Sequence, residues 1–150
     1  MTKFIGEWKC TECNNLDPVM IENGATQDFL NTFDTWERVL VIDIEGNEIY
    51  LRDDVGNCQV GTRFRLNKEI EEMTPDGRIV QSIITLDSDV QLTQIQRHGF
   101  HETRITRKVF GNNLTTKITA GDSVAVLKYV RIGEPKDSKQ YFVSTEPNKE

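Results

Sequence analysis

The sequence predicts an all-β domain, an antiparallel up-and-down β-barrel with two short helices inserted after its first strand. Residues 39–131 alternate between apolar and polar side chains with a period of two, which is typical of half-buried strands. Turn residues interrupt this alternation roughly every 8–12 residues, the spacing of a β-sandwich or barrel. A chain of 150 residues also has the length of one domain. The turns are Glu45-Gly46-Asn47, Pro75-Asp76-Gly77, Asp87-Ser88-Asp89, His98-Gly99-Phe100, Gly111-Asn112-Asn113 and Gly121-Asp122.

The segment before residue 39 has a helical pattern instead. Asn15 is a suitable N-cap for a helix beginning at Leu16, and Pro18 is tolerated in its first turn. Gly24 is placed to end this helix, because glycine readily adopts the left-handed conformation found after a helix.

A second short helix is predicted to begin at Thr26. Phe29 and Phe33 are four residues apart and therefore share one face of it. We expect both aromatic rings, together with Met20 of the first helix, to pack on the barrel and to contact whatever fills it.

The C-terminal segment differs in composition from the rest of the chain. Residues 133–150 include seven charged residues and two prolines, which predicts a polar and mostly disordered tail after a barrel domain of residues 1–132. The short run Tyr141-Phe142-Val143 is apolar enough to dock on the barrel, but one such run does not establish docking.

Charge and composition exclude several kinds of partner. The formal net charge is −6 and no basic stripe is interleaved with aromatic residues, so we expect no nucleic-acid partner. No apolar run is long enough for a secretory signal or a membrane span, which predicts a cytoplasmic location. Residues 15–37 contain five acidic residues and no Lys or Arg, so we expect weak or no contact with anionic membranes. We also expect a monomer.

The cysteines and histidines do not form a recognisable cofactor or metal motif. Cys10 and Cys13 resemble half of a zinc site, but His98 and His101 follow them 84 residues later, far beyond the usual spacing. An extended run from Cys10 to Cys13 separates their Cα atoms by roughly 10 Å, too far for a disulfide. We therefore expect no metal, no cofactor and free thiols at both residues and at Cys58.

The alternation of side chains between the two faces of a strand predicts an arginine that points into the barrel. From Thr103 to Val109, the outward face carries Arg104 and Lys108, and the other face carries Ile105 and Arg107. No acidic residue shares the inward face of this strand, so Arg107 is costly to bury unless it has a partner elsewhere. In the next strand Thr116 and Ile118 share the face of Leu114.

Several motifs resemble the intracellular lipid-binding proteins, a family that includes the fatty-acid-binding and cellular retinoid-binding proteins. Phe4-Ile5-Gly6-Glu7-Trp8-Lys9 is similar to the F-x-G-x-W-K opening of these proteins. Matches continue in order through the helical pair, the Glu45-Gly46-Asn47 turn, residues 72–78, residues 82–87 and Tyr129, and they cover residues 4–131. The resemblance implies a ten-stranded antiparallel barrel with a helix-turn-helix lid and an internal ligand cavity.

The resemblance also implies the ligand-binding residues. Members of the family hold a ligand carboxylate with an inward arginine, often joined by an R-x-Y pair on the last strand. Arg107 matches the first position and Tyr129 the last, but Leu127 stands where the second arginine is expected. Carboxylate recognition would then rest on Arg107 with help from Tyr129 and Thr116. The remaining candidate ligand contacts are Ile105, Ile118, Leu127, Met20, Phe29, Phe33, Asp76 and Arg78.

The sequence therefore predicts a non-catalytic carrier for a long-chain fatty acid or a similar hydrophobic carboxylate. No nucleophile, base or phosphate-binding loop converges on one segment as an enzyme would require. Other interpretations stay open at this point. The cargo could be a retinoid or another hydrophobic ligand, or the barrel could be a protein-interaction module. Arg107 could be satisfied within the protein, Tyr129 could be a core residue, and Asp76 could simply pair with Arg78 in a turn.

Overall fold

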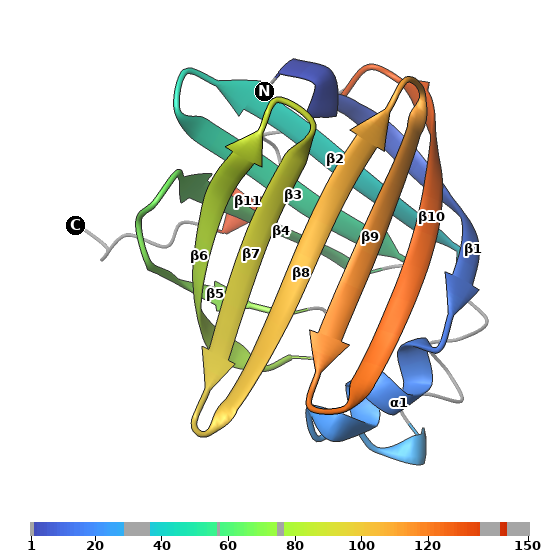
Figure 1. Ribbon diagram of the computed structural model, residues 1–150, viewed down its shortest axis with the longest axis vertical. Helices are drawn as coiled ribbons and strands as arrows, with labels where there is room; N and C mark the ends of the chain where they lie inside the picture. Colours follow the sequence, from blue (N-terminus) through green and yellow to red (C-terminus); the bar gives the residue numbers. More distant parts are fainter. Residues whose placement is uncertain (1, 29–36, 57, 75–76, 136–141, 144–150) are drawn as a thin grey trace.

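The computed structural model describes residues 2–28, 37–56, 58–74, 77–135 and 142–143, and these form a barrel with a helix at one end (Figure 1). Strands β6 to β10 make the wall that faces the viewer, and β1 to β4 make the wall behind it. The predicted all-β barrel is confirmed. The elements are η1 (Thr2–Phe4), β1 (Gly6–Asn14), α1 (Leu16–Glu22), β2 (Arg38–Glu45), β3 (Glu48–Val55), β4 (Cys58–Arg65), β5 (Ile70–Met73), β6 (Ile79–Ser88), β7 (Gln91–His98), β8 (His101–Phe110), β9 (Asn113–Ala120), β10 (Ser123–Gly133) and β11 (Phe142–Val143).

The first ten strands form an antiparallel up-and-down sheet that is closed by its first and last members. The order of hydrogen-bonded strands is β11-β4-β3-β2-β1-β10-β9-β8-β7-β6-β5. Because β1 pairs with both β2 and β10, the sheet curls back on itself. The consecutive strands β4 and β5 are the two ends of this ten-stranded run and do not pair with each other.

The short strand β11 lies on the free edge of β4. It pairs in parallel, with Phe142 opposite Gly61 and Val143 opposite Thr62. The preceding strand β10 ends at Gly133, one residue beyond the predicted domain boundary. Residues 136–141 and 144–150 lie outside the described part of the chain, so the domain boundary and the disorder of the tail stay predictions.

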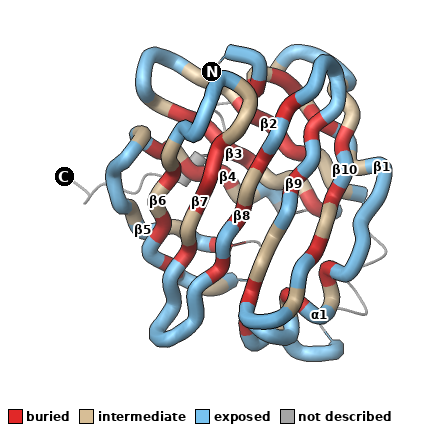
Figure 2. The backbone as a smooth tube through the Cα atoms, in the orientation of Figure 1, coloured by how far each residue is buried: buried red, intermediate tan, exposed pale blue. Residues whose placement is uncertain are grey.

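Burial alternates along the strands as the period-two pattern predicts (Figure 2). In β8 the side chains of Ile105, Arg107 and Val109 are buried, and Arg104 and Lys108 are exposed. Fully burying one large apolar side chain contributes about 1.5–3 kcal/mol, so this alternation fixes the register of each strand. Trp8 is completely buried and its indole N–H donates to the Phe4 carbonyl at 2.9 Å, which ties η1 to β1.

Helix α1 follows β1 directly and packs on the barrel through Leu16 and Val19, both of which are buried. Asn15 occupies the predicted N-cap position before Leu16, but its side chain makes no capping hydrogen bond. Its amide donates instead to the Val124 carbonyl at 3.1 Å, which anchors the helix to β10. Gly24 does follow the helix in a left-handed conformation, with φ +97°.

The second predicted helix is described only at its start. Gln27 and Asp28 are helical. Phe29 and Phe33 lie outside the described residues, so their predicted packing and ligand contacts stay predictions.

A β-bulge in β1 changes how the two N-terminal cysteines are placed. The register shifts between Cys10 and Glu12, so Cys10 lies opposite Tyr129 and Cys13 lies opposite Leu127. Since Tyr129 and Leu127 share the inward face of β10, the bulge turns both cysteines to one face of β1, which a regular extended run would not do. Neither Cys10 nor Cys13 forms a disulfide, and the side chain of Cys58 lies outside the described part of the structure.

Candidate functional site

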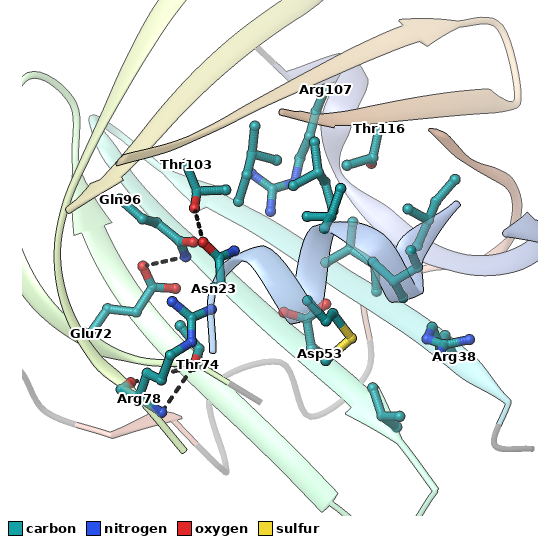
Figure 3. Close-up of a pocket in the computed structure, with 18 of the residues that line it drawn as sticks. Asn23, Arg38, Asp53, Glu72, Thr74, Arg78, Gln96, Thr103, Arg107 and Thr116 are labelled. Carbon is teal, nitrogen blue, oxygen red and sulfur yellow. Dashed lines mark hydrogen bonds between the residues drawn. The ribbon is translucent and has the colours of Figure 1, made fainter. Parts of the chain in front are cut away.

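A cavity inside the barrel lies beneath α1 and is lined by strands from both walls (Figure 3). Its volume is about 140 Å³. This is below the range of about 300–1,000 Å³ for sites that hold drug-sized ligands. Residues 29–36, which follow α1 in sequence, lie outside the described part of the chain. The cavity brings together eight of the predicted ligand contacts, namely Arg107, Tyr129, Leu127, Thr116, Ile105, Ile118, Met20 and Arg78.

Arg107 is the buried cation of this cavity. Its side chain extends from β8, the residue is 7% exposed, and Nη1 donates to the Gln94 amide oxygen at 2.7 Å. The Nε atom is buried without a hydrogen-bond partner. An unpaired buried donor costs about 1–3 kcal/mol, and more when it carries charge. Arg107 is therefore only partly satisfied within the protein.

Thr116 lies directly opposite Arg107 in the β8–β9 ladder. The residue is 4% exposed, and its hydroxyl oxygen is buried without a partner. On its other side Thr116 pairs with Leu127 of β10. The three side chains thus form a row across β8, β9 and β10, in which two under-satisfied polar groups stand beside one apolar group.

A hydrogen-bonded network extends from Arg107 to a second wall of the cavity. The amide nitrogen of Gln94 donates to the Glu72 carboxylate at 2.9 Å and to the Ser82 hydroxyl at 2.9 Å. The Gln96 amide donates to the same carboxylate at 3.2 Å. Burial raises the pKa of Glu72, and the hydrogen bonds from Ser82 and Gln96 oppose that rise.

Two further groups add polarity to the cavity. Tyr129 is 6% exposed, and burial raises the pKa of its hydroxyl, so the group stays protonated and able to donate. Asp53 also lines the cavity, and burial raises the pKa of its carboxyl, while the Arg107 and Arg38 charges lower it. The cavity lining therefore combines acidic and basic side chains with uncharged polar and aliphatic ones.

Two hydrogen bonds lie at the end of the cavity nearest α1, one from β8 to the end of the helix and one within the turn between β5 and β6. The Thr103 hydroxyl donates to the Asn23 side-chain oxygen at 3.0 Å, which ties the end of α1 to β8. Arg78 lines the cavity, and its backbone N–H donates to the Thr74 hydroxyl at 3.1 Å. Asp76 lies outside the described residues.

Three charged residues of the cavity are absent from the sequence-based site. Arg38, Asp53 and Glu72 come from β2, β3 and β5, at a distance in sequence from Arg107. The signal was present in the period-two pattern, because Asp53 shares the face of Leu51 and Val55. A search for charged residues at inward positions of every strand would have found all three.

The geometry suits a long apolar molecule with an acidic head group. The guanidinium of Arg107 and the hydroxyls of Thr116 and Tyr129 can bind a carboxylate, and the aliphatic side chains can cover an apolar chain. Among the described residues no three or more His, Cys, Asp or Glu side chains are grouped to hold a metal ion. No helix in the described residues is both long and apolar enough to span a membrane.

Comparison with known proteins identifies relatives along nearly the whole domain. The chain is 34% identical over 132 residues to a fatty acid-binding protein of Clonorchis sinensis, covering 87% of this chain and 99% of that protein. It is 30% identical over 132 residues to the 14 kDa fatty acid-binding protein of Schistosoma mansoni, covering 88% and 99%.

A solved structure shows the same architecture. The Schistosoma mansoni fatty acid binding protein in complex with arachidonic acid superposes with a TM-score of 0.85 at 29% identity, covering 89% of this chain and 98% of that chain. No family model matches the chain. The two sequence relatives, each matched over almost its full length, show that this chain belongs to the fatty-acid-binding protein family.

Proposed function

We propose that the protein is a cytosolic carrier that encloses one long-chain fatty acid in the barrel and catalyses no reaction. The observation that carries this proposal is the pair of neighbouring polar atoms, Arg107 Nε and Thr116 Oγ1, both buried in the cavity wall without partners. A ligand carboxylate that enters beside these neighbouring residues can accept hydrogen bonds from both groups. The related protein with arachidonic acid supports a fatty-acid ligand.

Burial of the apolar chain of the fatty acid against the aliphatic side chains of the cavity supplies most of the binding affinity. A chain of about fifteen methylenes contributes roughly 12 kcal/mol when buried at about 0.8 kcal/mol each. Loss of translational freedom and ordering of the chain offset much of this gain. We therefore assign chain burial to affinity and Arg107 to the orientation of the head group, with Tyr129 as a second donor.

The other interpretations of the sequence are less well supported. A retinol-type site uses glutamine at the position of Arg107, so an acid is favoured over an alcohol. A barrel without ligand capacity would be expected to fill its interior, but here the cavity is retained and polar. Transfer of ligand through water, and not by contact with anionic membranes, follows from the acidic residues 15–37.

Substitution of Arg107 tests this function directly. Arg107→Ala should weaken binding of palmitic acid by about 2–4 kcal/mol, because the carboxylate loses its charged partner. Palmityl alcohol, which makes no ion pair, should bind the variant as well as it binds the native protein. Titration of the delipidated proteins with both ligands measures the difference.

Arg104→Ala is the matched control, because Arg104 lies three residues away on the same strand and its side chain is exposed. This variant should bind both ligands normally. Equal losses for acid and alcohol in Arg107→Ala would show that Arg107 supports the barrel and does not bind the head group.

A further inference from the structure

Asp53 is an inward-facing carboxyl on the cavity wall opposite Arg107 (Figure 3). It belongs to β3, where its neighbours across the ladders are Leu40 of β2 and Val60 of β4. Arg107 and Thr116 belong to β8 and β9 on the other wall. Arg107 supplies the strongest opposing charge that acts on Asp53, so the two groups face each other within one cavity and do not lie at its opposite ends.

The two cavity carboxyls differ in how they are satisfied. Glu72 accepts hydrogen bonds from Gln94 and Gln96. Within the part of the chain that the structure describes, Asp53 accepts none from a protein group, although its neighbour Asp54 accepts two from Arg52 at 2.9 and 3.1 Å. Asp53 interacts with the described residues only through longer-range charges. Burial has the largest effect on the pKa of its carboxyl and raises it.

A purely hydrocarbon ligand is a poor partner for this carboxyl. Filling the cavity with methylenes removes water from Asp53 and supplies no donor in exchange, which is the costly case for a buried polar group. A ligand that carries a donor at the same point satisfies the carboxyl and gains affinity. Sites that hold such a buried polar group discriminate strongly against ligands that lack the matching group.

We propose that the preferred cargo is a hydroxylated long-chain fatty acid, whose carboxylate binds at Arg107 and Thr116 and whose hydroxyl donates to Asp53. This inference rests on the proposed function and names the ligand class more closely. A hydroxyl fits better than an amine, because the cavity also contains the Arg38 and Arg107 cations, which repel an ammonium group. A hydroxyl adds a donor without adding charge.

The test compares palmitic acid with a series of its monohydroxy derivatives, which are isomers of one another and in which the hydroxyl is moved stepwise from C2 to the terminal carbon. In the native protein at least one isomer should bind roughly ten-fold or more tightly than palmitic acid, since a hydrogen bond to a charged group is worth about one to two powers of ten in affinity. Asp53→Val should reverse this preference, binding palmitic acid more tightly than before and the favoured isomer no better than palmitic acid.

Two further variants separate ligand recognition from a structural role. Asp53→Asn keeps a carbonyl oxygen and should keep a reduced preference for the same isomer. Asp54→Asn alters the neighbouring carboxylate that bonds to Arg52 and should leave the preference unchanged. If Asp53 is only a counter-charge for the cavity arginines, Asp53→Val will raise affinity for palmitic acid and for every isomer by the same factor, and the inference is wrong.

The outcomes distinguish this inference from the proposed function. If palmitic acid binds and depends on Arg107, but no isomer binds more tightly than palmitic acid, the protein is a fatty-acid carrier and the role of Asp53 is refuted. If neither palmitic acid nor any isomer binds, the proposed function itself is refuted.

Discussion

At the scale of single residues, the cavity wall contains polar atoms that destabilise the empty barrel. The Thr116 hydroxyl is buried without a hydrogen-bond partner beside the partly satisfied Arg107. Groups of this kind lower the stability of the ligand-free protein, and in the proposed function a bound carboxylate satisfies them. Stability and ligand binding are therefore opposed at this position.

Thr116→Val tests this opposition, because valine has nearly the same shape as threonine and lacks the hydroxyl. We expect the variant to raise the free energy of unfolding of the delipidated protein by about 1 kcal/mol. It should also bind palmitic acid several-fold more weakly. Urea denaturation and ligand titration measure the two effects.

Thr115→Val is the control, because Thr115 is exposed on the opposite face of the same strand. It should change neither quantity by more than a few tenths of a kcal/mol. A Thr116→Val variant that is less stable and binds acid normally would contradict a role for this hydroxyl in the head-group site.

Strand parity predicted this end of the site from sequence, since Arg107, Thr116 and Tyr129 each lie at an inward position of a regular strand. It could not predict which residues meet across the barrel. Asp53 and Glu72 approach the head-group region only because the sheet curls closed, and that closure depends on the β1–β10 pairing between the two ends of the domain. The β-bulge that places Cys13 on the same face of β1 as Cys10 likewise cannot be predicted from a regular alternation of side chains.

At the scale of secondary-structure elements, the free edge of β4 is the feature that departs from a simple ten-stranded barrel. An unpaired strand edge is a site for pairing with another extended segment. Here β11 of the same chain occupies that edge. The segment is too short to contribute much stability on its own, so its pairing should be readily reversible.

Deleting residues 136–150 should therefore expose the edge of β4 without unfolding the barrel. We expect the β4 backbone amide that faces β11, within residues 61–63, to exchange with deuterium faster in the truncated protein. Amides of β8, which pairs with β7 and β9, should be unaffected and serve as the internal reference. Unchanged exchange at β4 after truncation would show that β11 does not protect this edge in solution.

The elements also show where local sequence rules succeed and where tertiary contacts override them. Gly24 ends its helix as predicted because the chain there requires a positive φ, which glycine adopts without strain. Asn15 occupies the N-cap position with φ +66°, but its side-chain amide donates to the Val124 carbonyl of the adjacent strand β10 and does not cap the helix. A rule for N-caps that considers only neighbouring residues cannot predict a hydrogen bond to a carbonyl 109 residues away in the sequence.

At the scale of the whole molecule, the barrel is a container whose interior is not filled by its own side chains. The sheet closes through β1 and β10, α1 covers one end, and the cavity beneath the helix retains both an apolar lining and charged groups. A protein selected only for stability would bury apolar side chains or fully hydrogen-bonded polar groups there. This arrangement is explained if one amphipathic molecule binds in the cavity and contacts both its apolar and its charged side chains.

Native mass spectrometry of the delipidated protein with added palmitic acid tests this account most directly. A single internal binding site should give one mass increment equal to one fatty acid, which saturates at one molecule per chain. Arg107→Ala should show the increment only at higher ligand concentration. A native protein that shows no increment, or increments that continue beyond one without saturating, would contradict a single internal binding site.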